Sequence, residues 1–418
     1  MNPTEQLIRQ RFQQYYLSSN ARLALPPKME KREYGFLLFK EKFMVRHRAF
    51  KSQEALLSAI RDLVPAHVYF STAYYKAPTA PMEEKGWLGA DLGFDIDADH
   101  LETPCKASHD AWKCKACQTM GQGTTPAICP KCKNDRLEEQ TWLCERCLQY
   151  AKEETLKLFD FLISDFGLDP NGFRIFFSGH RGYHVHVYWS KENQRELELN
   201  GPEEGRLEEE RRKEIVDYIL GNGLEAELHD LAETSIDGLK MVEGPEIGQP
   251  GWRRRMVAGI YDVLNGDIEQ PDLGLTSTQV NILKGWNRDR LLDKPLWSSI
   301  KGIGYSTWKN LARKAVERRS ARIDTVVTTD IHRLIRLPGT LNGHTGLLSV
   351  DMPRDDFDDF DPFTESIAFQ GQMKVQVKNA PEFRLGEKRF GPFRDEMVEL
   401  PAAAAMLLLC KRRAEPVA

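Results

Sequence analysis

The 418-residue sequence lacks an apolar run long enough to cross a bilayer, and it shows no export signal. We therefore expect a cytoplasmic protein that does not span a membrane. The sequence also lacks a large excess of charge of either sign, because its formal net charge is −4. Any surface that binds a polyanion must then be local. The length is sufficient for two or three domains with a sizeable core.

Cysteine is scarce outside one segment, because seven of the eight cysteines lie within residues 104–148. Most occur as C-x-x-C pairs, which in a reducing compartment favours metal ligation over disulfide formation. Two pairs form the inner group, whose spacing is that of a zinc ribbon: Cys114, Cys117, Cys129 and Cys132. The remaining possible ligands form the outer group: Cys105, His109, Cys144 and Cys147.

The pairing of these ligands is open from spacing alone. In the nested pairing, the inner group binds one zinc within a segment flanked by the outer group. In the sequential pairing, the first four ligands form one site and the last four form the other. A single zinc with spare cysteines is the third possibility. Each four-ligand set is closed, so we expect structural rather than catalytic metals.

An acidic strand is predicted over residues 93–99, where apolar residues alternate with Asp95, Asp97 and Asp99. Period two places the carboxylates on one face, close enough to share a divalent cation. Oxygen ligands without His or Cys suit Mg²⁺ or Mn²⁺. An isolated D-x-D is more often a solvated strand face, so the pattern needs support from elsewhere in the chain.

A glycine-flanked turn at residues 178–182 joins two further predicted strands, at 172–177 and 183–188. Glycine at 179 and 182 permits close backbone approach to a ligand. Ser178, Arg181 and His184 offer donors for phosphate oxygens. The alternative is a hairpin with a polar face.

The other predicted elements frame these motifs. We expect helices at 4–19, 52–63 and 149–166, strands at 32–39, 43–48, 68–75, 323–328 and 347–350, and mainly helical structure over 191–320. Asp330 is expected to cap a helix over 331–336. A short packed helix at 406–410 is expected to place Cys410 in the core and to end in the basic residues 411–413.

Three motifs occur together and in order: D-I-D, S-G-H-R-G-Y-H and I-D-T-V-V-T-T-D-I-H-R-L-I-R-L-P-G-T-L. The chain thereby resembles the small catalytic subunit of archaeal and eukaryotic DNA primases over most of residues 30–375. The resemblance implies a mixed α/β (α+β) primase-type catalytic domain with a zinc-binding insertion and a helical insertion. It also implies template-directed primer synthesis from nucleoside triphosphates. The implied segments are a catalytic domain at 1–103, 149–190 and 320–378, a zinc-binding insertion at 104–148, a mainly helical insertion at 191–319, and a C-terminal segment at 379–418.

The resemblance also implies residue roles. Asp95 and Asp97 match the family's metal-binding pair, and Asp324 matches its third carboxylate, which the residue pattern alone does not distinguish from Asp330. The residues implied in nucleotide binding are Ser178, His180, Arg181, His184, Arg336 and, more weakly, Arg46. Asn342 stands where the family often has histidine, and His344 is the alternative there. The family's zinc site resembles the outer group, which favours the nested pairing.

The implied cofactors are two Mg²⁺ or Mn²⁺ ions and two structural Zn²⁺ ions. The implied partners are a large subunit that carries an iron–sulfur cluster, a single-stranded DNA template and nucleoside triphosphates, with no membrane. One rival is a polymerase of the same fold that serves repair or a plasmid, and primer-independent synthesis discriminates it. A second rival is a non-catalytic zinc-ribbon protein that binds nucleic acid, against which the three aspartates argue.

Overall fold

The computed structural model describes residues 1–39, 44–188, 207–224, 232–236, 239–266, 273–287, 289, 291, 300 and 302–417. The chain forms two compact units: unit 1 contains residues 1–155, 169–209 and 323–418, and unit 2 contains residues 156–168 and 210–322. None of the helices among the described residues is long and apolar enough to cross a membrane. Mixed helices and sheets confirm the expected α/β class.

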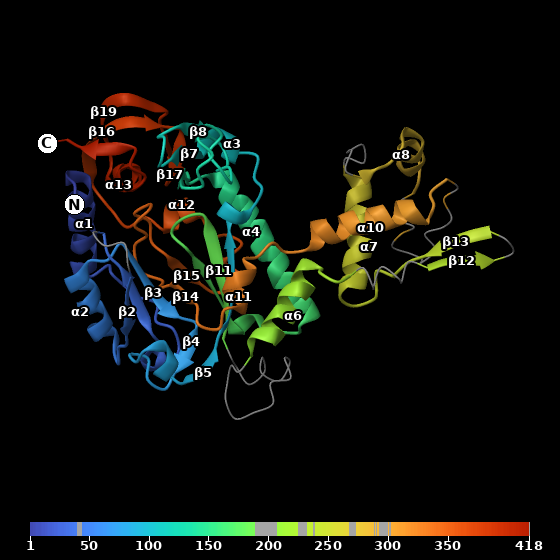
Figure 1. The fold of residues 1–418 in the computed structure, drawn as a ribbon, viewed down its shortest axis with the longest axis horizontal. Helices are drawn as coiled ribbons and strands as arrows, with labels where there is room; N and C mark the ends of the chain where they lie inside the picture. The colour runs from blue at the N-terminus through green and yellow to red at the C-terminus, as the bar shows by residue number, and fades with distance from the viewer. Residues whose placement is uncertain are drawn as a thin grey trace. The chain divides into compact units, whose positions relative to one another are not determined.

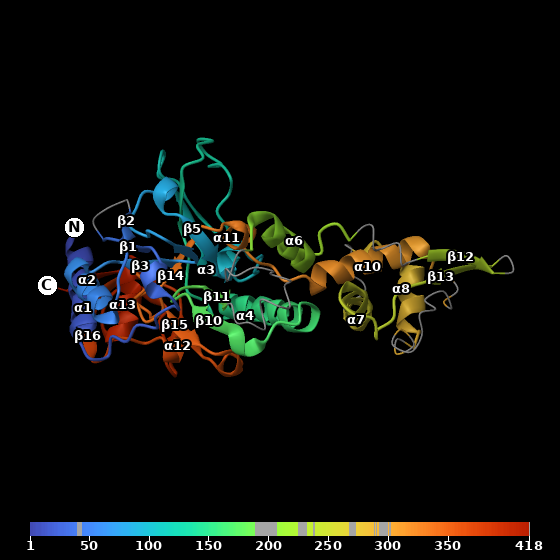
Figure 2. The same ribbon diagram turned by 90° about the horizontal axis from the view of Figure 1, so that it is seen from below.

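The first sheet of unit 1 has the strand order β14-β3-β1-β2, and every neighbouring pair is antiparallel. Its strands are β14 (Leu334–Arg336), β3 (His67–Ser71), β1 (Tyr34–Leu37) and β2 (Met44–Arg48). Alternating aromatic and aliphatic side chains bury one face, with Phe36, Val68 and Phe70 fully buried. Two helices lie beside this sheet in both views (Figures 1 and 2): α1 (Pro3–Leu17) and α2 (Gln53–Leu63). Side chains of Asn2 and Ser52 cap their first turns.

The second sheet of unit 1 carries the acidic strand and has the order β15-β10-β11-β6. Its strands are β15 (Val350–Met352), β10 (Phe173–Phe177), β11 (Gly182–Val187) and β6 (Leu92–Asp97). The antiparallel register of β11 and β6 places His184 opposite Asp95 and Gly182 opposite Asp97. Phe94 and Ile96 are buried whereas Asp95 and Asp97 are half-buried, as period two predicts.

Three local predictions were wrong. The strand expected at 68–75 is two strands in different sheets, β3 and β4 (Ala73–Tyr75), because the chain breaks at Thr72, whose amide donates to Arg333. The strand expected at 323–328 is helix α11 (Thr325–Thr329). The helix expected at 331–336 is absent from the described chain, because β14 pairs there with β3.

The cysteine-rich segment and the C-terminal segment also belong to unit 1. The cysteine-rich segment contains α3 (Lys106–His109), the sheet β8-β7-β9 (Met120–Gln122, Ala111–Cys114, Leu137–Gln140) and the start of α4 (Glu145–Asp160). Strand β4 pairs with β5 (Trp87–Ala90), and α12 spans Pro362–Glu365. The C-terminal segment contains the sheet β19-β16-β20 (Phe393–Pro401, Gln372–Ala380, Ala414–Pro416), the pair β17-β18 (Phe383–Leu385, Lys388–Phe390) and α13 (Ala402–Cys410).

Unit 2 is mainly helical in its described part. Its helices are α6 (Glu209–Leu220), α7 (Trp252–Asn265), α8 (Ser277–Lys284) and α10 (Tyr305–Arg319), and its hairpin is β12-β13 (Ala232–Ile236, Leu239–Glu243). Apolar faces of α7 and α10 form its core around Trp308 and Ile260. The functional division of the chain into catalytic domain and insertions stays a prediction.

Candidate active site

The acidic strand presents two carboxylates to a cavity of about 680 Å³. Asp95 and Asp97 occupy alternate positions of β6, and both line the cavity. Asp99 also lines it, although β6 ends at Asp97 and Asp99 lies in a short 3₁₀ turn. The Oδ1 atom of Asp97 accepts from the Asp99 amide at 2.9 Å, which fixes this turn.

Asp324 is attached to the acidic strand from a distant segment of the chain. Its amide donates to the carbonyl of Asp95 at 2.8 Å, so its backbone is attached directly to β6. Its carboxylate caps α11 by accepting from the amides of Val326 and Val327. The cap explains why a β-branched run that favours a strand forms a helix here. Neither Asp324 nor Asp330 is among the residues that line the cavity. Asp330, the competing candidate, accepts from the His332 amide, whereas Asp324 is bonded to β6 and its charge acts on Asp95.

The charges of Asp97 and Asp324 both act on Asp95. The acidic group whose ligand atoms lie within 4.8 Å of one another is Asp97 and Asp99 with His180. Burial, and then the charges of Asp97 and Asp324, raise the pKa of Asp95 to about 8. Burial also raises the pKa of Asp97. The Oδ1 atom of Asp95 is buried and has no hydrogen-bond partner among the described residues, and Nε2 of His184 lies 3.4 Å from it. A divalent cation would relieve this repulsion and satisfy that oxygen, so the donor set fits Mg²⁺ or Mn²⁺.

The turn at residues 178–182 lies directly against β6. A Cβ atom on Gly182 would lie 2.5 Å from the carbonyl oxygen of Ile96, so only glycine permits this approach. Gly179 has a φ of 74°, the left-handed conformation that the tight turn requires. Ser178 Oγ accepts from the amides of His180 and Gly182, each at 3.3 Å. Ser178, His180 and His184 all line the cavity, and their role in phosphate binding stays a prediction.

The position of Arg181 in the structure contradicts the prediction that its side chain contacts phosphate. Its side chain is fully buried, and its guanidinium donates to both carboxylate oxygens of Asp110, to the Trp142 carbonyl and to Asp99. Arg181 does not line the cavity. A glycine-flanked arginine has the composition of a phosphate-binding residue, but the buried Asp110 supplies a closer anion. Arg181 therefore positions the turn against the segment that follows β6.

Arg46, expected near the incoming nucleotide, pairs with Glu33 instead. Its guanidinium donates to both carboxylate oxygens of Glu33, at 3.0 and 3.2 Å, and it does not line the cavity. Arg336 does line the cavity, with NH1 2.6 Å from Nδ1 of His67. Asn342 also lines the cavity; it is buried and donates to the Ser178 carbonyl, so it supports the turn as well. Its Oδ1 accepts from the His344 amide, and His344 lines the cavity.

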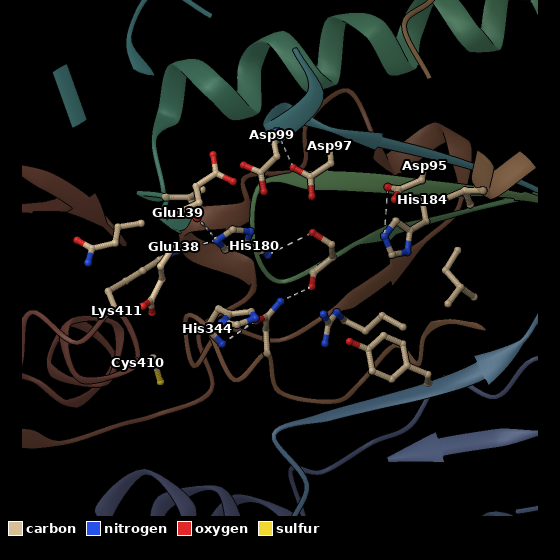
Figure 3. A pocket seen from close by; sticks show the side chains of 18 of the residues that line it. Asp95, Asp97, Asp99, Glu138, Glu139, His180, His184, His344, Cys410 and Lys411 are labelled. Carbon is tan, nitrogen blue, oxygen red and sulfur yellow. Dashed lines mark hydrogen bonds and ion pairs between the residues drawn. The ribbon is translucent and has the colours of Figure 1, made fainter. Parts of the chain in front are cut away.

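The opposite side of the cavity is rich in nitrogen. Figure 3 shows Asp95, Asp97 and Asp99 on one side. His344, Cys410 and Lys411 lie on the other side, with His180 between the two sets. Nζ of Lys411 lies 2.7 Å from Nε2 of His180. Burial lowers the pKa of Lys411 to about 7 and that of His344 to about 4, and it holds His180 well below its ordinary pKa. Residue patterns did not single out Lys411 or Arg333 as site residues, and only tertiary packing brings them to this cavity.

The cysteines form two groups with nested membership. Ligand atoms of the outer group lie within 4.8 Å of one another, and so do those of the inner group. Sulfur atoms of Cys105 and Cys147 are 3.5 Å apart, and those of Cys117 and Cys129 are 3.7 Å apart. Tetrahedral zinc with Zn–S bonds of about 2.3 Å separates its sulfur ligands by about 3.8 Å. Both groups fit a closed metal site, and this geometry contradicts the sequential pairing. Cys410, expected in the core, instead lines the cavity at the end of α13.

Carboxylates on one side of a cavity and basic side chains on the other are the groups that metal-dependent enzymes use to act on phosphorylated substrates. The family model for the DNA primase small subunit matches residues 131–353. The chain is 30% identical to the DNA primase small subunit PriS of Nitrosopumilus maritimus, covering 99% of each chain. It is 32% identical to PriS of Methanothrix thermoacetophila and to PriS of Methanococcoides burtonii, covering 99% of this chain and 98% of each relative. The chain belongs to the DNA primase small subunit family. It is thus a nucleotidyltransferase of DNA replication, and its reaction is primer synthesis.

Proposed function

We propose that Asp95, Asp97 and Asp324 hold two Mg²⁺ or Mn²⁺ ions and form the catalytic centre for nucleotidyl transfer. The observation that carries this proposal is the attachment of Asp324 to β6, which brings a third carboxylate to a crowded acidic pair with an unsatisfied oxygen. When bound, the cations supply Lewis-acid activation of a 3′-hydroxyl and neutralise charge on the triphosphate.

The chain's own residues bind and orient the nucleotide. Ser178, His180 and His184 present polar atoms along the wall next to the aspartates, and Arg336 and His344 do so from β14 and the segment that follows it. These groups hold the triphosphate so that its α-phosphate faces the carboxylates. Asn342 and Arg181 act on the nucleotide indirectly, by holding the turn that carries these donors.

The outer and inner groups each hold one structural Zn²⁺. The buried carboxylate of Asp110, 2.8 Å from Nδ1 of His109, supports this assignment for the outer group. Such a carboxylate fixes the tautomer of a metal-bound imidazole and leaves Nε2 for the metal. Both ligand sets are complete with protein atoms, so neither has an open position for substrate.

The partners we propose are a large subunit that carries an iron–sulfur cluster and a single-stranded DNA template, and we propose that the protein acts in the cytoplasm. The name "small subunit" of the relatives supports the first partner. Pairing with the template base selects the nucleotide, so we expect template binding that weakens with salt and depends little on sequence.

The proposed function is tested by assaying the full-length chain, alone and with its large subunit, on single-stranded DNA with labelled nucleotides and Mg²⁺ or Mn²⁺. Primed and unprimed templates are compared in parallel. We expect dinucleotides and longer products on the unprimed template. Extension of a primer without any product on the unprimed template would contradict primer initiation by this pocket and favour a polymerase of the same fold.

A further inference from the structure

The end of α13 contributes a cation to the active-site cavity that the roles assigned so far leave unused. Residues 410–413 line the cavity together with the aspartates and with the turn at residues 178–182. This Cys-Lys-Arg-Arg sequence is distant from the turn along the chain, because Lys411 lies 231 residues after His180. The basic end of the C-terminal helix is therefore a wall of the active site.

The backbone fixes the position of Lys411. The amides of Arg412 and Arg413 donate to the carbonyls of Leu409 and Leu408, at 3.0 and 2.8 Å. This pair of bonds is the Schellman motif that ends a helix, with Lys411 as the last half-helical residue. Arg412 takes the left-handed position with a φ of 56°, where glycine is usual. The helix before it is buried from Ala402 to Leu409, so Lys411 starts from a rigid support.

The side chain of Lys411 is directed at the turn that carries the phosphate donors. Its Nζ lies 2.7 Å from Nε2 of His180. The turn's own guanidinium, that of Arg181, is buried and held by Asp110 and Asp99. Lys411 thus places an ammonium group where the turn lacks an accessible cation. Glu138 and Glu139 also line this part of the cavity, yet no ion pair between them and Lys411 occurs among the described residues.

We propose that Lys411 binds the triphosphate of the incoming nucleotide next to His180, so that the C-terminal helix completes the nucleotide site. This inference rests on the proposed function of the cavity, and it adds a residue from a segment outside the three motifs. The charge of the ammonium group faces the triphosphate, and the imidazole of His180 holds the lysine in place before nucleotide arrives.

The test measures binding of ATP with Ca²⁺ to the full-length protein by calorimetry, because Ca²⁺ allows binding to be measured without turnover. Lys411→Met keeps the aliphatic stem and removes the charge, and Lys411→Arg keeps the charge. The matched control is Lys378→Met, because Lys378 is an exposed lysine of β16 that pairs with Glu415 and does not line the cavity. We expect Lys411→Met to weaken ATP binding about 10- to 100-fold, as for a lost charge-assisted hydrogen bond. Lys411→Arg should recover most of this loss, and Lys378→Met should bind as wild type does.

A folded Lys411→Met protein that binds ATP like wild type overturns the proposal, and so does a Lys411→Arg protein that is as weak as Lys411→Met. A second measurement needs no variant. Inorganic tripolyphosphate with Ca²⁺ should slow acylation of Lys411 in the wild-type protein by an amine-selective reagent, with Lys378 as the internal reference. Equal labelling of Lys411 with and without tripolyphosphate overturns the proposal. A separate assay tests the proposed function on which this inference rests. Full primer synthesis by an Asp97→Asn protein would contradict that function, whatever the result for Lys411.

Discussion

The outer and inner groups have similar ligands but different relations to the active site. In the outer group, His109 contacts Asp110, and Asp110 accepts two hydrogen bonds from Arg181. Arg181 in turn contacts Asp99 and lies in the turn that packs on β6. The inner group lies in the β8-β7-β9 ribbon, where Cys132, Met120 and Ile128 are exposed. Strands β7 and β9 of the same ribbon carry Lys113, Glu138 and Glu139, which line the cavity, so the inner group is linked to the site through the backbone pairing of these strands.

The difference shows that a structural metal site acquires catalytic importance through the residues that contact its ligands. Asp110 is buried and accepts from His109, Trp142 and Arg181, so it joins the outer group to the phosphate-binding turn. A buried charged network of this kind is costly to break, because removing one member leaves another charge unpaired. The outer group therefore supports the turn at residues 178–182 through buried charges, whereas the inner group supports the ribbon whose strands β7 and β9 form part of the cavity wall.

The largest expected loss of primer synthesis comes from changing the aspartates of β6. Losses caused by changes in the outer and inner groups are compared with this loss. Asp95→Ala or Asp97→Ala should lower primer synthesis by about a thousandfold or more, because each empties a ligand position of the cation pair. Fold should be retained, since removal of one carboxylate also relieves the repulsion that raises the pKa of Asp95. Initial rates together with thermal unfolding check this. Near-normal synthesis by either variant rules out the two-metal assignment.

The next largest expected effect is a loss of synthesis that distinguishes the outer group from the inner group. Cys147→Ser should release one zinc, lower the unfolding midpoint and reduce synthesis at least about tenfold, because Cys147 is fully buried in the outer group. Cys132→Ser is the matched variant, because Cys132 is an exposed ligand of the inner group. It should also release one zinc but keep most of the synthesis. Metal analysis, unfolding curves and initial rates are compared on both proteins. Equal losses of synthesis would remove the distinction between the groups.

A smaller effect tests the link through Asp110. Asp110→Asn should retain both zinc ions but weaken the hold on Arg181, and we expect synthesis to fall about 3- to 30-fold, of order 1–2 kcal/mol. Asp135→Asn, on the exposed part of the inner ribbon, is the control. The measurement is the initial rate at saturating nucleotide, with zinc content determined on the same samples. If the two variants have the same rate, the outer group does not act through Asp110.

The smallest effect is expected from removing the inner group as a whole. Residues 114–132 can be replaced by a short glycine linker, because the register pairs Lys113 of β7 with Glu138 of β9 and so keeps the cut ends close. The deletion should remove one zinc, keep the other and leave synthesis within about threefold of wild type. Metal content and initial rates check it. A protein that retains no zinc, or that loses synthesis, would show that the inner group also supports the active site.

The sequence was sufficient where a local pattern determines the structure. Alternation of apolar residues with aspartates predicted β6 and its half-buried Asp95 and Asp97. Cysteine spacing predicted two ligand groups, and the structure brings together the nested sets. Glycines 179 and 182 predicted a tight turn whose backbone can approach a ligand closely, and in the structure the turn is present with Gly182 against β6. Each of these features is visible as short motifs in the sequence, such as a D-x-D, a C-x-x-C or a glycine pair.

The sequence was insufficient where tertiary contacts decide. A Thr-Val-Val-Thr run favours a strand, but the Asp324 cap and its bond to β6 produce α11. The choice of Asp324 over Asp330 came from the family resemblance and not from the residues. Arg181 had the composition of a phosphate ligand, and only the fold shows Asp110 beside it. Lys411 lies in a C-terminal segment with no local pattern that predicts its contact with His180.

The central claim is that carboxylates from two distant segments form one catalytic centre, and Asp324 tests it most directly. Asp324→Asn and Asp330→Asn are measured side by side for dinucleotide synthesis on unprimed single-stranded DNA. Both asparagines can still cap their turns, so both proteins should fold. We expect Asp324→Asn to lose at least about a hundredfold in rate and Asp330→Asn to stay within about threefold of wild type. Normal synthesis by a folded Asp324→Asn protein would contradict the claim.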